Sequence, residues 1–466
     1  MNAAQNFGFR IALCALFIGC FLGVAHAVSV ATLHVTLDPN EGWNAYFAQM
    51  AIATGSPYPP SGSFLVDNYP PLSFFLVGEV GRVLGDEIIA GRLVSLVSLG
   101  FVAFATARTA RRAGCSVEYA AFAGLILIAC LLLTSDYVGI DDPQMLGHAI
   151  AIAGMLAALQ EPRTSRAMVA SALLLTLAFF VKHNLVLLPA SLALWLAFVD
   201  RRQAIIFMAS GAVFLLVGLG LFREMFGVGF FEQIASARLY SLENIRVGAL
   251  NWLPWAAIPI GGSICLLFLG RKEPVAIFAA VYTAIATGGG LVFSGGAGVD
   301  ANAFFDADIA LALSAALLFG RLQGRIWAVV VATLYVIPLV LLLRNVDGDW
   351  LDASYWLHPM ADDARVAEQE IRLLHSKPDP VLCEMLSLCY WAQRSPQVDV
   401  FNMDQGLRTG ARHADDLLAA IDRKRYSLIE LESLRPFPLP PQIEKAIFRN
   451  YSVARTDDER AFLTPR

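Results

Sequence analysis

The first candidate site is a pair of carboxylates, Asp38 and Glu41, which directly follow the first long apolar segment of the chain. A carboxylate beside a lipid bilayer is costly unless it faces water, a metal or a substrate, so the pair indicates a site at the membrane surface. There, one carboxylate can act as a general base. The alternative is structural, because Asp38 can cap a helix by accepting the free N–H of Asn40 or Glu41.

Two more sets of charged residues are expected on the same side of the membrane. One is acidic, Asp136, Asp141 and Asp142, and one is basic, Lys182, His183, Arg223, Arg238 and Arg246. Oxygen ligands suit a hard divalent cation, Mg²⁺ or Mn²⁺, and its candidate ligands are Asp38, Glu41, Asp141 and Asp142. Carboxylates, a metal and nearby cations are the groups that displacement of a phosphate leaving group requires.

Both sets also have structural interpretations. Asp141 and Asp142 precede Pro143, a sequence typical of a capped helix with proline in its first turn. Lys182 and His183 can instead reach from a helix end to the membrane interface and keep their polar ends in water. The spacing of these residues leaves both alternatives open.

The composition is that of an integral membrane protein. Of the 466 residues, 57% are hydrophobic and 16% are charged, and a mean hydropathy of +0.59 excludes an ordinary soluble protein. The net charge of −5 gives no support to nucleic-acid binding. About half of the charged residues lie in the last quarter of the chain. We therefore expect a membrane body at 1–343 and a soluble C-terminal domain at 344–466.

Apolar windows predict about eleven transmembrane helices in the body. They cover residues 9–36, 88–107, 117–135, 143–160, 167–181, 184–199, 204–222, 251–270, 273–293, 306–320 and 326–343. The loop 37–86 contains a short apolar segment, Ser73 to Leu84, which is expected to lie at the interface. Basic residues gather in alternate loops, among them Arg10, Arg111, Arg201 and Arg271. The positive-inside rule then places the N-terminus in the cytoplasm and the C-terminal domain outside it.

The C-terminal domain alternates helical and strand patterns. Helices are expected at 362–375 and 415–422, and strands at 380–383, 397–401 and 426–431. This alternation is typical of a small α/β domain. Cys383 and Cys389 can form a disulfide if the domain is extracytoplasmic, and the alternative is two free thiols.

Four short motifs resemble the bacterial GT-C glycosyltransferases, which include the lipid A aminoarabinose transferases and the protein O-mannosyltransferases. They are Asn40-Glu41-Gly-Trp-Asn-Ala-Tyr-Phe-Ala-Gln-Met50, Tyr69-Pro-Pro-Leu72, Lys182-His-Asn184 and Gly296-Ala-Gly-Val-Asp-Ala-Asn-Ala-Phe-Phe305. The resemblance implies a GT-C-like polytopic helical protein of the bacterial inner membrane. It also implies transfer of a sugar from a polyprenyl-phosphate carrier to a hydroxyl of a glycan, lipid or protein on the extracytoplasmic face. The family usually inverts the sugar linkage and often uses a divalent cation.

The resemblance implies site residues as well. In the family a first-loop aspartate is the base, but here Asn40 stands in its place, so either Asp38 or Glu41 takes that role. The donor phosphate is expected to contact Lys182, His183, Arg223 and Arg238. The substrate is expected to contact Trp43, Tyr69, Asp300 and Asn302. For Trp43, anchoring at the membrane interface is the alternative.

Two other classes of function share many of these features. A transporter or flippase for a lipid-linked sugar is expected to have charges or helix breaks at mid-membrane depth, often in two related halves. A surface-polysaccharide ligase or polymerase is expected to have one large loop between late spans. Here the charges lie at span ends and in the first loop. This pattern favours sugar transfer.

Overall fold

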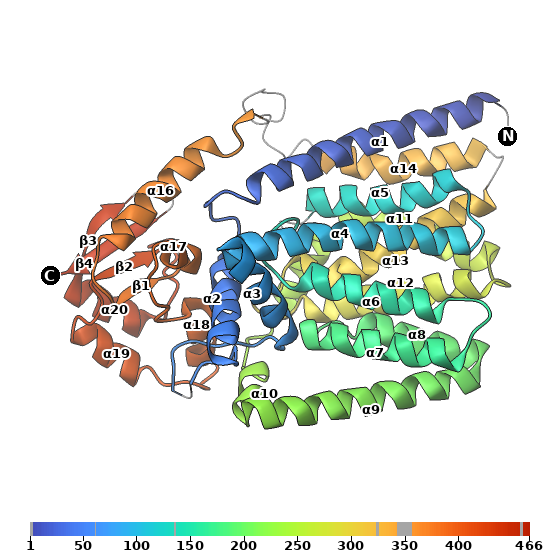
Figure 1. The fold of residues 1–466 in the computed structure, drawn as a ribbon. Coiled ribbons are helices and arrows are strands. Elements are labelled where there is room, and N and C mark those ends of the chain that lie inside the picture. Colours follow the sequence, from blue (N-terminus) through green and yellow to red (C-terminus); the bar gives the residue numbers. More distant parts are fainter. Residues whose placement is uncertain (1–2, 61, 135–136, 323–325, 343–356, 457–459) are drawn as a thin grey trace.

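The computed structural model describes residues 3–466 apart from 61, 135–136, 323–325, 343–356 and 457–459. Long helices run side by side in a bundle, and a small domain containing a sheet packs against one end of it (Figure 1). Asp136 and the expected boundary at 343/344 lie outside the described residues.

A helix occupies each of the apolar windows. In chain order the helices of the bundle are α1 (Ala3–Val30), α4 (Glu87–Arg112), α5 (Val117–Thr134), α6 (Gln144–Ala158), α7 (Ser165–Val181), α8 (Leu187–Val199), α9 (Arg201–Phe226), α11 (Leu242–Leu269), α12 (Pro274–Phe293), α13 (Phe305–Arg321) and α14 (Ile326–Leu342). Helices satisfy every backbone hydrogen bond internally, which lipid requires. Within the described residues, six helices are long and apolar enough to cross a membrane, and α5 to α8 are shorter. The protein is therefore a multi-pass membrane protein, while the count of about eleven spans stays a prediction.

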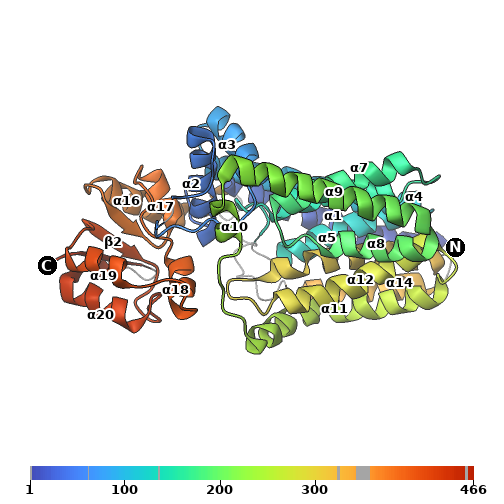
Figure 2. The same ribbon diagram turned by 90° about the horizontal axis from the view of Figure 1, so that it is seen from below.

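Three shorter helices and a turn of 3-10 helix gather at the end of the bundle nearest the C-terminal domain. They are α2 (Pro39–Thr54), α3 (Leu72–Leu84), α10 (Gly229–Ile234) and η1 (Ala301–Phe304). Helices α2 and α3 run across the bundle axis, and α10 lies at the end of α9 (Figures 1 and 2). The apolar segment expected at 73–84 is therefore a helix that packs against α2 and the start of α4, where Phe74 and Val77 share a hydrophobic cluster with Ala90.

Helix α13 forms the centre of the bundle. Every side chain from Phe305 to Phe319 is buried, including two carboxylates in the first turn. Asp308 accepts hydrogen bonds from the indole N–H groups of Trp252 and Trp255, at 2.9 and 2.8 Å, and Asp306 accepts one from the Tyr282 hydroxyl. Because buried carboxylates are stable only when they are hydrogen-bonded, these contacts fix α13 against α11 and α12.

The helix ends and loops in which the basic residues occur lie at the end of the bundle opposite the C-terminal domain, where the N-terminus lies (Figure 1). Arg10 of α1 forms an ion pair with Glu118 at 3.1 Å, which joins the N-terminal part of α1 to the first turn of α5. Arg112 donates to the Leu156 carbonyl at 3.0 Å, which joins the last turns of α4 and α6. Arg321 at the end of α13 pairs with Glu273 just before α12. The charge pattern read from the sequence thus corresponds to one physical end of the bundle.

The C-terminal domain is a four-stranded sheet with helices around it. Its elements are α16 (Ala361–His375), β1 (Val381–Cys383), α17 (Leu386–Trp391), α18 (Val400–Arg408), α19 (Asp415–Asp422), β2 (Leu428–Leu431), α20 (Pro441–Asn450), β3 (Tyr451–Thr456) and β4 (Ala461–Pro465). The strand order is β1-β2-β4-β3, with β1 and β2 parallel and the other pairs antiparallel. A parallel pair needs a long crossover, and α17 to α19 supply it.

The strand expected at 397–401 is wrong. Asp399 instead caps α18, because its carboxylate accepts the N–H of Asn402 at 2.9 Å. The alternating valines at 398 and 400 resemble a strand pattern. In the structure they lie at the start of α18, and both are buried in the core of the domain. Capping by aspartate therefore outweighs the local strand propensity.

The C-terminal domain is docked on the first loop through α17 and α2. Trp43 and Phe47 of α2 share a hydrophobic cluster with Leu386 and Leu388 of α17. The two backbones approach so closely at Gly42 that a Cβ atom there would lie 2.0 Å from the amide nitrogen of Ser387. Only glycine fits such an approach, so the two helices form one packed unit.

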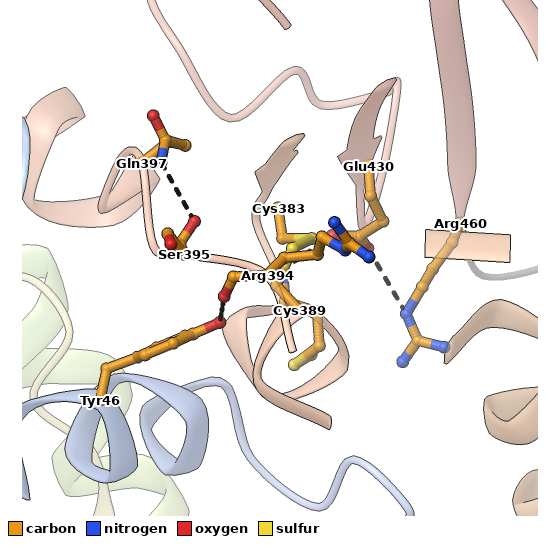
Figure 3. The surroundings of a disulfide bond; sticks show 9 residues. Tyr46, Cys383, Cys389, Arg394, Ser395, Gln397, Glu430 and Arg460 are labelled. Atoms are coloured by element: carbon orange, nitrogen blue, oxygen red, sulfur yellow. Dashed lines mark hydrogen bonds and ion pairs between the residues drawn. A yellow bond between two sulfur atoms is a disulfide. The ribbon is translucent and has the colours of Figure 1, made fainter. Parts of the chain in front are cut away.

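The structure pairs Cys383 with Cys389, which joins the end of β1 to α17 (Figure 3). Beside the disulfide, the Arg394 carbonyl accepts a hydrogen bond from the Tyr46 hydroxyl of α2. The disulfide therefore fixes the part of the domain that contacts the first loop.

Removing this disulfide is expected to destabilise the C-terminal domain. Replacing both cysteines by serine (Cys383→Ser, Cys389→Ser) should lower its free energy of unfolding by about 2 kcal/mol, because the unfolded chain gains freedom when a short loop is opened. Hydrogen exchange of α17 and β1 in the full chain measures this change. Cys265→Ser, at an exposed free cysteine, is the control. Unchanged protection of α17 in the double variant would contradict the expectation.

Candidate functional site

Glu41 is part of a buried ion pair. Arg92 of α4 donates to both of its carboxylate oxygens, at 2.7 and 2.6 Å, and neither side chain is exposed to solvent. Arg92 also donates to the carbonyls of Leu33 and Val35 in the α1–α2 connection, at 2.7 and 2.6 Å. These contacts hold the connection, α2 and α4 together, and they leave Glu41 poorly placed to accept a further proton.

Glu41 also binds the chain just before α6. The backbone N–H of Asp141 donates to Glu41 Oε1 at 3.1 Å, and the Asn44 side chain donates to the Asp141 carbonyl at 2.6 Å. Hydrogen bonds to an ionised carboxylate are among the stronger ones. Glu41 thus brings the first loop against the segment that contains Asp141 and Asp142.

Asp38 caps α2 and is only half-buried. Its Oδ1 atom accepts the N–H of Asn40 at 2.7 Å, so the structural interpretation of this residue is correct. Burial, with the nearby charges of Asp142 and Glu41, raises the pKa of Asp38 to about 6. A carboxylate with such a pKa is largely ionised at pH 7 and is a stronger base than an ordinary aspartate.

Lys182 is the centre of a group of residues that we call the Lys182 cluster: Asp38, Tyr69, Tyr137, Asp142 and Lys182. The Lys182 ammonium lies 2.7 Å from Asp142 Oδ1, 4.7 Å from the centre of the Tyr69 ring and 5.9 Å from that of Tyr137. Asp38 is close enough for the Asp142 charge to raise its pKa. Lys182 is 3% exposed, so it does not extend to the interface as the structural alternative predicts.

Asp142 combines the two roles that the sequence left open. Its Oδ1 atom accepts a hydrogen bond from the backbone N–H of Gln144 at 2.7 Å, which caps the start of α6 after Pro143. The same oxygen accepts a hydrogen bond from the Lys182 ammonium. Lys182 itself ends α7, and the 182–186 turn separates α7 from α8. Two helix ends therefore position this ion pair.

The other residues expected at a phosphate divide into two groups. His183 and Arg238 lie near Lys182, because burial and the charges of Lys182 and Arg238 lower the pKa of His183 to about 4. His183 is therefore neutral at pH 7 and can offer only a hydrogen bond. Arg223 is exposed in the last turn of α9, and Arg246 pairs with Glu243 on the exposed first turn of α11. Among the described contacts, neither reaches the Lys182 cluster.

The residues expected at the substrate also divide. Tyr69 lies under the Lys182 ammonium, and Asp300 caps η1 near Tyr137. Trp43 is only 7% exposed, and its indole N–H donates to the Val66 carbonyl and to Asp399 at 2.8 and 2.9 Å. Trp43 is therefore an interior residue and not an exposed membrane anchor or an open stacking surface. Asn302 is buried within η1, two residues after Asp300.

Buried polar atoms without a hydrogen-bond partner occur throughout the described structure, and several belong to the first loop or to the candidate residues named above. They include Asn44 Oδ1, Asp67 Oδ2, Ser73 Oγ, Asp141 Oδ2, Asp142 Oδ2, His183 Nδ1, Arg238 Nε and Asn302 Oδ1. Buried polar groups are normally paired, so each of these unpaired atoms is a candidate contact for a water molecule or a ligand. A small cavity with room for about one water molecule is lined by Asn44, Ser73, Asp141 and Asp142.

The expected metal ligands are not arranged as a group of three or more. Within the described residues, no three His, Cys, Asp or Glu side chains lie close enough together to hold a metal ion. Arg92 occupies Glu41 and Lys182 occupies one oxygen of Asp142. Asp141 has a free Oδ2 atom, but burial and the charges of Glu41 and Asp142 raise its pKa well above the usual value. The divalent cation stays a prediction, and no step below depends on it.

Comparison with solved structures identifies the fold. The structure of ArnT from Cupriavidus metallidurans bound to undecaprenyl phosphate aligns with a TM-score of 0.61 and 16% identity, over 95% of this chain and 97% of ArnT. The apo structure of the same ArnT aligns with a TM-score of 0.59 and 14% identity, over 98% of each chain. The chain has a GT-C fold. No protein-family model and no curated protein matches the sequence.

The GT-C fold places several residues at this site that sequence reasoning missed. Arg92 lies in an apolar window, and an arginine in such a window is itself a signal for a buried partner. Tyr137 and Asp399 have no comparable local signal, since each reaches the site only through long-range packing. Two glycines around the start of the 296–305 motif are closely packed, Gly295 on Tyr240 and Gly298 on Phe401.

Proposed function

We propose that this protein transfers a sugar from a polyprenyl-phosphate carrier to an acceptor hydroxyl at the extracytoplasmic surface of the bacterial inner membrane. One observation carries the proposal: a half-buried carboxylate, Asp38, and a buried ammonium, Lys182, lie within one cluster at the end of a GT-C bundle. A base and a cation at one site are what displacement of a phosphate requires. The undecaprenyl phosphate bound by ArnT, which shares this fold, supports the choice of carrier.

In the proposed reaction, Asp38 takes the proton of the acceptor hydroxyl. The acceptor oxygen attacks the anomeric carbon, and the bond from that carbon to the phosphate oxygen breaks with its electron pair going to the phosphate. Attack opposite the leaving group inverts the sugar linkage. Lys182 and Arg238 stabilise the charge of the departing polyprenyl phosphate, and His183 can donate a hydrogen bond to it. We assign the base to Asp38 because Arg92 holds both oxygens of Glu41.

The proposed orientation places the Lys182 cluster and the C-terminal domain outside the cytoplasm. The basic loop residues gather at the opposite end of the bundle, and such residues favour the cytoplasmic side. The disulfide between Cys383 and Cys389 supports the same orientation, because disulfides persist in oxidising compartments.

The proposal is tested with purified protein and undecaprenyl phosphates that carry glucose, mannose or 4-amino-4-deoxyarabinose. Transfer to lipid A, glycan or peptide acceptors is measured together with carrier translocation in proteoliposomes. The expected result is a glycosidic product with at least one donor. Translocation of the carrier without any product would overturn sugar transfer in favour of a flippase.

Asp38→Asn is expected to reduce the transfer rate by about 10²- to 10⁴-fold, the usual contribution of a general base. Because the pKa of Asp38 is raised to about 6, the wild-type rate should rise as pH increases through that value and level off above it. The ionised form is the active one, so acid pH inactivates the enzyme. A pH series with both proteins measures this. Glu41→Gln is the comparison, and a wild-type acid limb that persists in Asp38→Asn would assign the base elsewhere.

A further inference from the structure

Helix α18 of the C-terminal domain touches three separate segments of the membrane body at the proposed site. The carboxylate of Asp399, the N-cap of α18, accepts the indole N–H of Trp43 in α2 at 2.9 Å. The backbone N–H of Asp399 donates to the carbonyl of Phe64 in the first loop at 3.1 Å. Gln405 accepts the backbone N–H of Leu239 at 3.1 Å. The start of α18 is therefore fixed relative to the Lys182 cluster.

Between these anchors, Phe401 is directed toward Arg238. The guanidinium lies 5.5 Å from the centre of the Phe401 ring. On another side, the ring packs on Gly298, where a Cβ atom would lie 2.5 Å from Phe401 Cζ and where φ is +69°. Both the close approach and the positive φ favour glycine. The contacts with Arg238 and Gly298 hold the ring in place.

Phe401 nevertheless remains 43% exposed. Two of its neighbours in α18, Asn402 and Met403, are buried, as is Val400 before it. An aromatic ring that is fixed by its surroundings and still partly open to solvent provides a surface for a ligand, and aromatic side chains commonly line binding sites.

We infer that Phe401 forms one wall of the sugar-binding site, so that the C-terminal domain contributes directly to recognition of the donor. This inference rests on the proposed function, in which Arg238 contacts the donor phosphate. The sugar is joined to that phosphate through a single oxygen atom, so it must lie beside Arg238. The exposed part of the Phe401 ring is available there to the apolar C–H face of a sugar ring. Phe401 is thus a residue that determines donor specificity.

The test separates recognition of the sugar from recognition of the phosphate. Binding of undecaprenyl phosphate, with and without glucose, mannose or 4-amino-4-deoxyarabinose attached, is measured for the wild type, Phe401→Ala and Phe401→Trp in detergent micelles. Phe401→Ala should raise the Kd of a sugar-bearing donor by about tenfold, the scale of an aromatic contact, and leave the Kd of undecaprenyl phosphate unchanged. Phe401→Trp should retain most of the affinity for the sugar-bearing donor.

Val453→Ala is the matched control, because Val453 is a similarly exposed apolar residue of the same domain, at 42%. It should change neither Kd. Equal weakening of both ligands by Phe401→Ala would mean that the ring acts only through Arg238, and unchanged binding of the sugar-bearing donors would mean that it does not meet the sugar; either result overturns the inference. A wild type that prefers sugar-bearing carriers but transfers no sugar would refute the proposed reaction and leave the inference standing. A wild type that binds none of the carriers would overturn both.

Discussion

Replacing Arg92 by methionine is expected to destabilise the protein by about 3–5 kcal/mol, the usual effect of breaking a buried ion pair. The variant leaves the Glu41 carboxylate charged in an interior with no access to solvent. It also removes the donors to the Leu33 and Val35 carbonyls. Denaturant unfolding in detergent, followed by tryptophan fluorescence, measures the change in the free energy of unfolding.

Two further variants define the cause of this effect. Adding Glu41→Gln to Arg92→Met removes the unpaired charge and should restore part of the lost stability. Arg246→Met is the control, because the ion pair of Arg246 with Glu243 is exposed and such pairs contribute little. If Arg92→Met is as stable as Arg246→Met, the loss of Arg92 does not leave a costly unpaired charge on Glu41. The Arg92–Glu41 ion pair would then not organise this region.

Lys182→Met is expected to reduce sugar transfer by about 10²- to 10³-fold, the typical effect of removing one group that stabilises charge in the transition state. Lys182 is the buried cation of the cluster, so in the proposed reaction it balances the charge that develops on the departing phosphate. Steady-state rates with the donor that the wild type uses measure the loss. Lys182→Arg should recover part of the activity because it restores the charge.

The loss must be separated from a folding defect, because Lys182→Met leaves Asp142 without its partner. The double variant Lys182→Met with Asp142→Asn removes both charges and should fold more stably than the single variant, yet stay inactive. Lys272→Met, which replaces an exposed lysine before α12, should leave the rate unchanged. Full transfer by the folded double variant would remove Lys182 from the proposed mechanism.

The two ion pairs explain why the Asp38 region and the Lys182 region lie together. Glu41 binds Arg92 of α4 and the backbone of Asp141, and the next residue, Asp142, binds Lys182. The first loop, the start of α6 and the end of α7 are therefore linked by consecutive charged contacts. The residue that most resembles the second acid of the family motif thus has an organising role, and the half-buried Asp38 is left as the candidate base.

The sequence alone determined the positions of the bundle helices, the gathering of basic residues in alternate loops and the place of the helix 415–422 in the C-terminal domain. These features depend on apolar length, helical periodicity and charge, which are local properties of the chain. The strand expected at 397–401 failed because the local pattern is ambiguous over so few residues. The segment from Val400 is a helix because Asp399 caps it and its apolar side chains are buried in the domain core.

Only the tertiary structure decided which charges meet. Glu41 and Arg92 are 51 residues apart in sequence, Asp142 and Lys182 are 40 apart, and Trp43 and Asp399 are 356 apart. Each pair forms because particular helix ends are packed side by side, and no local pattern encodes that packing. The division between a catalytic candidate and a structural carboxylate therefore follows from burial and partners, which the chain acquires only when it folds.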